Sequence, residues 1–130
     1  MKYSILVMAS PTAGQGSATA VSFARSLLAR GHTLHNVFFQ GDAVGNGVAN
    51  AIFPQDERNL GGEWAALAEQ HKIELILCIS SALRRGVLDK VEAHRYERAA
   101  STLHPAFTIG GLGQLVDASA NSDRLITFGH

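Results

Sequence analysis

The chain has 130 residues, with 11 basic and 11 acidic side chains, so its formal net charge is zero. A zero net charge argues against nucleic acid as a main partner, because nucleic-acid binding generally requires a basic surplus. It also leaves little charge repulsion between copies, which favours self-association or a fixed protein partner. The length fits one domain with one hydrophobic core, spanning residues 1–130.

The cysteine content and the hydropathy pattern indicate the compartment. Cys78 is the only cysteine, so no internal disulfide can form and nothing points to an oxidising compartment. The opening residues 1–14 imitate a signal peptide, but their apolar run spans only about five residues and fits a first strand better. No stretch approaches the roughly 20 apolar residues of a membrane span. We therefore expect a cytoplasmic protein with no membrane association.

The first part of the chain predicts a strand, a helix and a second strand. Residues 2–8 form an apolar run typical of a buried strand. Apolar side chains at helical spacing then predict a helix that Ser17 or Thr19 caps and that ends near Arg30. Residues 33–40 predict the next strand. This order is the unit expected of a parallel sheet with helices on both faces.

The middle of the chain predicts a long loop and a helix. Residues 41–57 contain three glycines, two asparagines and one proline, which indicates a functional or interface loop. We expect one helical turn within it, at residues 48–53. Asp56 or Asn59 can cap the following helix, which extends to His71.

The last part of the chain predicts five further elements. Residues 73–79 predict a strand buried on both faces, and residues 87–101 an exposed or partner-facing helix that Pro105 ends. A short strand, a helix and a final strand follow, over residues 106–109, 112–119 and 124–128. Together these elements predict an α/β fold with three α/β/α layers and a five-stranded, mainly parallel sheet.

Cys78 lies near the carboxyl end of the predicted buried strand, where open α/β sheets place their chemistry. Ser80 and Ser81, both good N-cap types, follow it, and then the basic pair Arg84 and Arg85. The residues alone leave two interpretations of Cys78. It is either a buried and inert core residue, or a thiolate whose pKa a helix N-terminus and the guanidinium groups lower. Only one of two adjacent arginines can face the cysteine on a helix, and we expect Arg84 to do so.

Other candidate sites have simpler explanations. The Gly-rich loop at residues 10–17 precedes a helix, but it lacks the Gly-Lys-Ser/Thr ending of a P-loop and the full Gly-x-Gly-x-x-Gly spacing, so a plain β-to-α turn explains it. His32 and His35 would point to opposite faces of a strand, so we expect no metal site. Ser80 and Ser81 lack a nucleophile elbow, and no cofactor is implied.

The remaining histidines are isolated, although His94 could neighbour Cys78 in space; they are His71, His94, His104 and His130. The acidic pairs are expected to cap or solvate helices; they are Asp56 with Glu57 and Asp89 with Glu92.

Three segments of the sequence resemble one family. The run CISSALRRGV, with GLGQLVDAS and SDRLITFG downstream, is similar to the TusD/DsrE family of cytoplasmic sulfur-relay proteins, and the similarity extends over most of the chain. The spacing Cys-x-x-x-Ala-Leu-Arg-Arg-Gly is its specific part. The overall resemblance is nearer to DsrE, the subunit of the DsrEFH complex, although the motif residues do not separate DsrE from TusD.

The resemblance implies a function for Cys78. In the family, the cysteine at this position carries sulfur as a persulfide, and we expect Cys78 to accept sulfur from a donor and pass it to an acceptor protein's cysteine. The biological setting would be cytoplasmic sulfur oxidation or, alternatively, sulfur delivery for tRNA thiolation. The family also implies a heterohexamer with two related small subunits, two copies of each. The competing hypothesis is a non-catalytic binding or assembly subunit whose Cys78 is inert.

Overall fold

The structure is a computed structural model that describes residues 1–129, and its centre is a five-stranded sheet with the strand order β4-β3-β2-β1-β5. Every pair of neighbouring strands is parallel. The sheet therefore confirms the predicted fold class, and it is parallel throughout. The strands are β1 (Lys2–Val7), β2 (Thr33–Phe39), β3 (Glu74–Cys78), β4 (Thr108–Gly110) and β5 (Arg124–Phe128).

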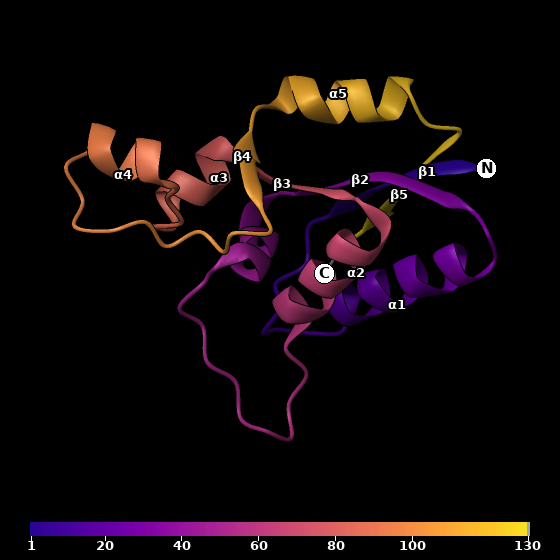
Figure 1. Cartoon of the computed structure of the whole chain (residues 1–130), viewed down its shortest axis with the longest axis horizontal. Helices are drawn as coiled ribbons and strands as arrows, with labels where there is room; N and C mark the ends of the chain where they lie inside the picture. Colours follow the sequence, from indigo (N-terminus) through magenta and orange to yellow (C-terminus); the bar gives the residue numbers. More distant parts are fainter. Residues whose placement is uncertain (130) are drawn as a thin grey trace.

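Helices cover both faces of the sheet, as predicted (Figure 1). The helices α1 (Gly16–Ala29) and α2 (Leu60–His71) lie on one face, and α5 (Leu112–Ala120) lies alone on the other. The connection through α5 leads from β4 at one edge of the sheet to β5 at the opposite edge. Because crossovers between parallel strands are right-handed, reversing the direction along the sheet places the connecting helix on the opposite face.

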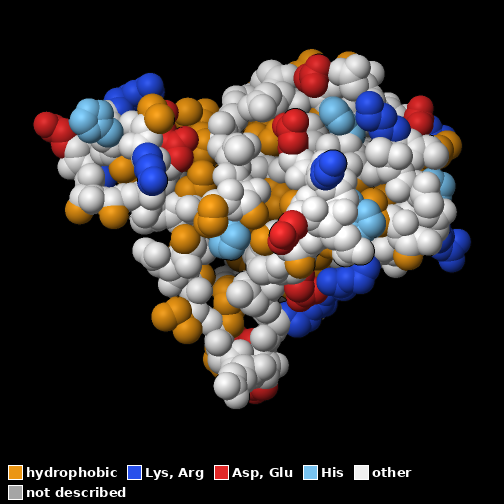
Figure 2. All heavy atoms as spheres, viewed as in Figure 1, with side chains coloured by type: hydrophobic (Ala, Val, Ile, Leu, Met, Phe, Trp, Pro, Cys, Tyr) orange, Lys and Arg blue, Asp and Glu red, His pale blue; other side chains and the backbone are white. Residues whose placement is uncertain are grey.

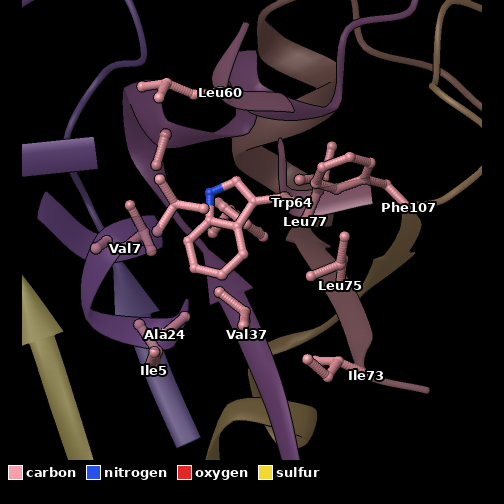
Figure 3. Close-up of a cluster of buried hydrophobic side chains, with 14 of the residues drawn as sticks. Ile5, Val7, Ala24, Val37, Leu60, Trp64, Ile73, Leu75, Leu77 and Phe107 are labelled. Atoms are coloured by element: carbon pink, nitrogen blue, oxygen red, sulfur yellow. The ribbon is translucent and has the colours of Figure 1, made fainter. Parts of the chain in front are cut away.

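The larger part of the core lies between the sheet and the helices α1 and α2 (Figure 3). Alternate residues of the central strands point into it, among them Ile5, Val37 and Leu75. The fully buried Trp64 of α2 stands edge-on to Phe39, with the ring centroids 5.6 Å apart. Trp64 therefore packs α2 against the sheet.

A smaller cluster occupies the other face of the sheet, beneath α5. It contains Phe38, Ile76 and Cys78, and Leu6 and Leu115 pack against it. Period-two alternation along the strands separates these residues from the larger core. The predicted strand is thus buried on both faces, and Cys78 points to the face with a single covering helix.

The capping of α1 differs from the prediction. Gln15 is the N-cap residue, and its side chain makes no capping hydrogen bond. The hydroxyl of Ser17 donates instead to the carbonyl of Ala9 at 2.8 Å, which ties the helix back to the end of β1. The hydroxyl of Thr19 donates to the carbonyl of Gln15 at 2.9 Å, one turn earlier. Both hydroxyls are thus used as donors to carbonyls, so neither caps the helix.

The long loop has its helical turn earlier than predicted. A 3-10 helix spans Gly41–Gly47, whereas residues 48–53 contain no helical turn. The reason is tertiary: Ala43 and Val44 are fully buried in the larger core. The remaining segment, residues 49–59, extends away from the body of the molecule (Figure 1). Asn59 caps α2, as one of the two predicted alternatives, by accepting a hydrogen bond from the amide of Gly62 at 3.0 Å.

The predicted helix over residues 87–101 is wrong, because only α4 (Lys90–Arg95) forms there. Asp89 caps it by accepting from the amide of Glu92 at 2.8 Å. Glu97 then adopts the left-handed conformation, with φ at +55°, and the amide of Arg98 donates to the carbonyl of Ala93 at 2.8 Å. This Schellman motif ends the helix ten residues before the predicted stop at Pro105. A second short helix, α3 (Ile79–Arg84), precedes it.

The visible surface in Figure 2 carries interspersed basic and acidic side chains, consistent with the zero net charge. Within residues 1–129, no helix is long and apolar enough to cross a membrane. The same residues contain no group of three or more His, Cys, Asp or Glu side chains that could hold a metal ion. His130, which we expected to be an isolated histidine, lies outside the described residues.

Candidate functional site

Cys78 is the last residue of β3 and the N-cap residue of α3, so the chain turns from strand to helix at the sulfur-bearing residue. Ile79, predicted to end the strand, begins the helix instead. In the sheet, Cys78 lies opposite Gly110 of β4. Its predicted position near the carboxyl end of a buried strand is therefore confirmed.

Ser80 and Ser81 lie in the first turn of α3, and neither is the predicted side-chain cap. The Ser80 hydroxyl lies 3.4 Å from the Cys78 sulfur and forms a hydrogen bond with it. The Ser81 hydroxyl accepts a hydrogen bond from the amide of Gly41 at 3.0 Å. Ser80 therefore contacts the sulfur directly, and Ser81 holds the start of α3 against the segment that follows β2.

The surroundings of the thiol favour its ionised form. Burial by itself raises the pKa of Cys78, because a buried thiolate loses hydration. Hydrogen bonds from the hydroxyls and amides of Ser80 and Ser81 act in the opposite direction and outweigh burial, so the pKa of Cys78 lies below its usual value. A lowered pKa increases the thiolate fraction near neutral pH, and the thiolate is the nucleophilic form of cysteine.

The sulfur is nevertheless well covered, since Cys78 is only 3% exposed. Leu115 of α5 packs against the cluster that contains Cys78, and the Gln114 side chain lies directly above Gly110. A Cβ atom at Gly110 would collide with the Gln114 side chain and lie 2.9 Å from Cγ2 of Ile76. The glycine opposite Cys78 thus leaves the space that the Gln114 side chain occupies.

The two arginines of the motif have different surroundings. Arg85 forms an ion pair with Asp42 at 3.1 Å and donates to the carbonyl of Ser81 at 3.1 Å. Arg84 has no carboxylate partner within residues 1–129. The causes that lower the pKa of Cys78 are the serine hydrogen bonds, and neither guanidinium is among them.

Arg84 lines a surface cleft of about 580 Å³ that also includes Ser80. The cleft lies between α3 and the segment that contains α4. Its lining residues are Ser80, Leu83, Arg84, Gly86, Leu88, Tyr96 and Arg98. Because Ser80 also contacts the sulfur, one side chain connects Cys78 to this cleft.

Sequence patterns missed three contributors to this region: Gly110, Asp42 and Arg98. The sheet register brings Gly110 beside Cys78, and the fold of the loop after β2 brings Asp42 to Arg85. Arg98 was hidden because the residues around it predicted a longer helix. His94, considered as a neighbour of Cys78, is an exposed residue of α4 and does not line the cleft.

Comparison with known proteins identifies the family. The sequence profile of the DsrE/DsrF-like family matches residues 1–128. The chain belongs to the DsrE/DsrF-like family. This membership confirms the resemblance that the Cys78 motif and the two downstream segments predicted.

Relatives in this family include proteins named as sulfurtransferases. The chain is 41% identical to the DsrE protein of Allochromatium vinosum over 129 residues, which cover 99% of each chain. It is 44% identical to the sulfurtransferase TusD of Serratia proteamaculans over 124 residues, covering 95% of this chain and 96% of the relative. It is also 39% identical to TusD of Salmonella dublin over 128 residues, covering 98% of this chain and all of the relative. The chain is therefore a member of a sulfur-transfer family, as predicted.

Solved structures show the same fold at low sequence identity. The ychN protein of E. coli superposes with a TM-score of 0.79 at 19% identity, covering 98% of this chain and 99% of that one. The MTH1491 protein of Methanobacterium thermoautotrophicum superposes with a TM-score of 0.68 at 12% identity, covering 96% and 97%. These similarities show the three-layer fold of this family member.

Proposed function

We propose that this protein is a sulfur carrier whose Cys78 accepts sulfur as a persulfide and passes it to a cysteine of an acceptor protein. The main support is the thiol itself, since hydrogen bonds from Ser80 and Ser81 lower the pKa of Cys78 at the strand end of a sulfur-transfer family member. A sulfur carrier needs one nucleophilic thiol that can reach its donor. Cys78 is the only residue of the chain that supplies one.

The transfer is a thiol exchange that balances without an oxidant or a metal. The Cys78 thiolate attacks the outer sulfur of a donor persulfide, the sulfur–sulfur bond of the donor breaks, and the donor leaves as a thiolate. Cys78 then holds the transferred sulfur as Cys78–S–SH. In the second exchange, an acceptor thiolate attacks that outer sulfur and regenerates the Cys78 thiolate. One cysteine is sufficient because the next thiol arrives on another protein.

Two biological settings fit this chemistry. We favour sulfur oxidation in the cytoplasm, following the resemblance to DsrE. The alternative is sulfur delivery for tRNA thiouridine formation, which the TusD relatives favour at 39% and 44% identity. We further propose that the carrier acts within a heterohexamer containing two copies each of this chain and two related small subunits.

A non-catalytic role is the main competing hypothesis. It is favoured by the burial of Cys78, which is 3% exposed and packs with Phe38 and Ile76. An inert core cysteine would react with a small alkylating reagent only after the fold opens, slowly and with the pH dependence of an ordinary exposed thiol. A functional thiolate would react in the native state, with a rate that rises with pH through the lowered pKa.

Intact mass spectrometry after incubation with a persulfide donor tests the proposal. The native protein should gain the mass of one sulfur atom, and a reductant should remove it. The Cys78→Ser variant should keep its fold and gain no sulfur, because a serine hydroxyl stays un-ionised at neutral pH. Sulfur uptake by this variant, or no uptake by the native protein from any donor, would contradict the proposal.

A further inference from the structure

The cleft beside Ser80 carries positive charge that no acidic side chain balances. Arg84 and Arg98 both line it, and none of its seven lining residues is acidic. Within residues 1–129, neither guanidinium has a carboxylate partner. The neighbouring Arg85, in contrast, is paired with Asp42. Two unpaired guanidinium groups at one cleft favour an anionic ligand, and carboxylates suit their planar donors.

Arg98 is held at the cleft by the fold. The left-handed turn at Glu97 directs the chain out of α4, and the Arg98 amide is bound to the carbonyl of Ala93 at 2.8 Å. The Arg98 guanidinium donates to the carbonyl of Tyr96 at 2.8 Å. The backbone of Arg98 is therefore fixed at the cleft, and one hydrogen bond orients its exposed guanidinium.

Hydrogen bonds from Thr102 hold the wall of the cleft at Gly86 and Leu88. The Thr102 hydroxyl donates to the carbonyl of Gly86 at 2.5 Å and accepts from the amide of Leu88 at 2.9 Å. The amide of Thr102 donates to the carbonyl of Leu88 at 2.8 Å. Leu83 and Leu88 add apolar surface to the lining. The cleft thus combines a fixed wall, apolar contact area and two cations, which are the usual features of a small-molecule site.

The volume of the cleft favours an organic ligand over a simple inorganic anion. At about 580 Å³ it lies within the roughly 300 to 1,000 Å³ typical of pockets for organic ligands, and far exceeds the space of a simple inorganic anion. Ser80 lines the cleft and also lies 3.4 Å from the Cys78 sulfur. The cleft therefore reaches the residue that contacts the thiol.

We propose that this cleft binds a low-molecular-weight persulfide bearing carboxylates, of the glutathione persulfide type, and presents its outer sulfur to Cys78. This inference rests on the proposed function and names one class of donor for it. The Cys78 thiolate attacks the outer sulfur of G–S–SH, the G–S–SH sulfur–sulfur bond breaks, and its electron pair leaves with the glutathione thiolate. The products are Cys78–S–SH and G–S⁻, so atoms and charge balance and no oxidant is consumed. Arg84 and Arg98 bind the carboxylates and take no part in the exchange.

The test compares loading rates from donors that differ in charge. Intact mass spectrometry would follow sulfur uptake by the native chain from glutathione persulfide, from the persulfide of glutathione diethyl ester, and from inorganic disulfide. We expect saturable loading by glutathione persulfide and a slower, non-saturating reaction of the ester. Arg84→Ala and Arg98→Ala should each lower kcat/KM for glutathione persulfide by about fivefold, as expected for a partly exposed ion pair, with the ester unaffected. Arg30→Ala, at an exposed arginine of the C-terminal end of α1, is the matched control.

A binding measurement guards against variants that fold poorly. S-methylglutathione, which cannot transfer sulfur, should bind to Cys78→Ser, and the affinity should fall when Arg84 or Arg98 is also replaced by alanine. Replacement by lysine should retain part of the binding. Equal loading by the charged and esterified persulfides, or efficient loading only from a protein donor such as a persulfidated rhodanese, would overturn the cleft as the donor site and leave the carrier function standing. No loading from any of these donors would instead overturn the proposed function, and this inference with it.

Discussion

Replacing Ser80 by alanine tests whether its hydroxyl activates Cys78. The hydroxyl lies 3.4 Å from the sulfur, a long contact, so we take the lower end of the about 1.5 to 3 kcal/mol typical of a hydrogen bond to a charged group. About 1.4 kcal/mol corresponds to a factor of ten in an equilibrium between protonation states. Loss of the Ser80 hydroxyl should raise the pKa of Cys78, because the raising effect of burial is then less strongly opposed. The thiolate fraction near neutral pH should fall roughly tenfold.

The assay is the rate of alkylation of native Cys78 by iodoacetamide as a function of pH. Ser80→Ala should be roughly tenfold slower near pH 7 than the native protein, with the same plateau at high pH where both thiols are ionised. Ser26→Ala, at an exposed serine of α1, controls for the loss of a hydroxyl in general. An unchanged pH profile would refute the role of Ser80. An equal change at every pH would show altered access to the sulfur instead of an altered pKa.

Three further predictions concern stability and assembly. Glu63→Gln should destabilise the fold at pH 7 by about 0.5 to 1 kcal/mol. The hydrogen bond with Arg58 lowers the pKa of the Glu63 carboxyl more than burial raises it, so the charged carboxylate stabilises the folded state. A carboxyl whose pKa is lowered by folding stabilises the folded state at pH values above its unfolded-state pKa. The difference in unfolding free energy between the native protein and the variant, measured by urea titration, should therefore vanish as the pH falls through the folded-state pKa. Glu69→Gln, at an exposed residue, serves as control. Gly110→Ala should cost about 1 to 3 kcal/mol in the same titrations, because the new methyl group would displace the Gln114 side chain and crowd Ile76. Gly113→Ala, which meets open space, should be neutral or stabilising, and equal effects of the two substitutions would contradict this crowding. By light scattering at micromolar concentration, the chain alone should self-associate and should form a defined hetero-oligomer with its two related subunits; a stable monomer that ignores them would contradict the proposed assembly.

Local pattern was sufficient for the elements with a strong apolar signal. The central strands were predicted because their apolar residues form short continuous runs, which are typical of strands buried on both faces. Gly31 is a glycine that ends a helix in the usual way, since it adopts the left-handed conformation, with φ of +84°, just after α1. The helix over residues 87–101 failed because helix formers are abundant there, while Asp89 and the left-handed Glu97 confine the helix to six residues.

For the candidate site, the sequence by itself determined that one cysteine lies at the end of a buried strand and precedes a serine pair and an arginine pair, in a motif that identifies the family. Only the tertiary structure decided what those residues do. The position of the 3-10 helix gives Ser81 its partner at Gly41, and the sheet register places Gly110 beside Cys78. The fold of the segment after α3 brings Arg98 to the same cleft as Arg84, although fourteen positions separate them in the chain. These contacts join segments that are distant in sequence, and no periodicity within one segment carries information about which distant segment will pack against it.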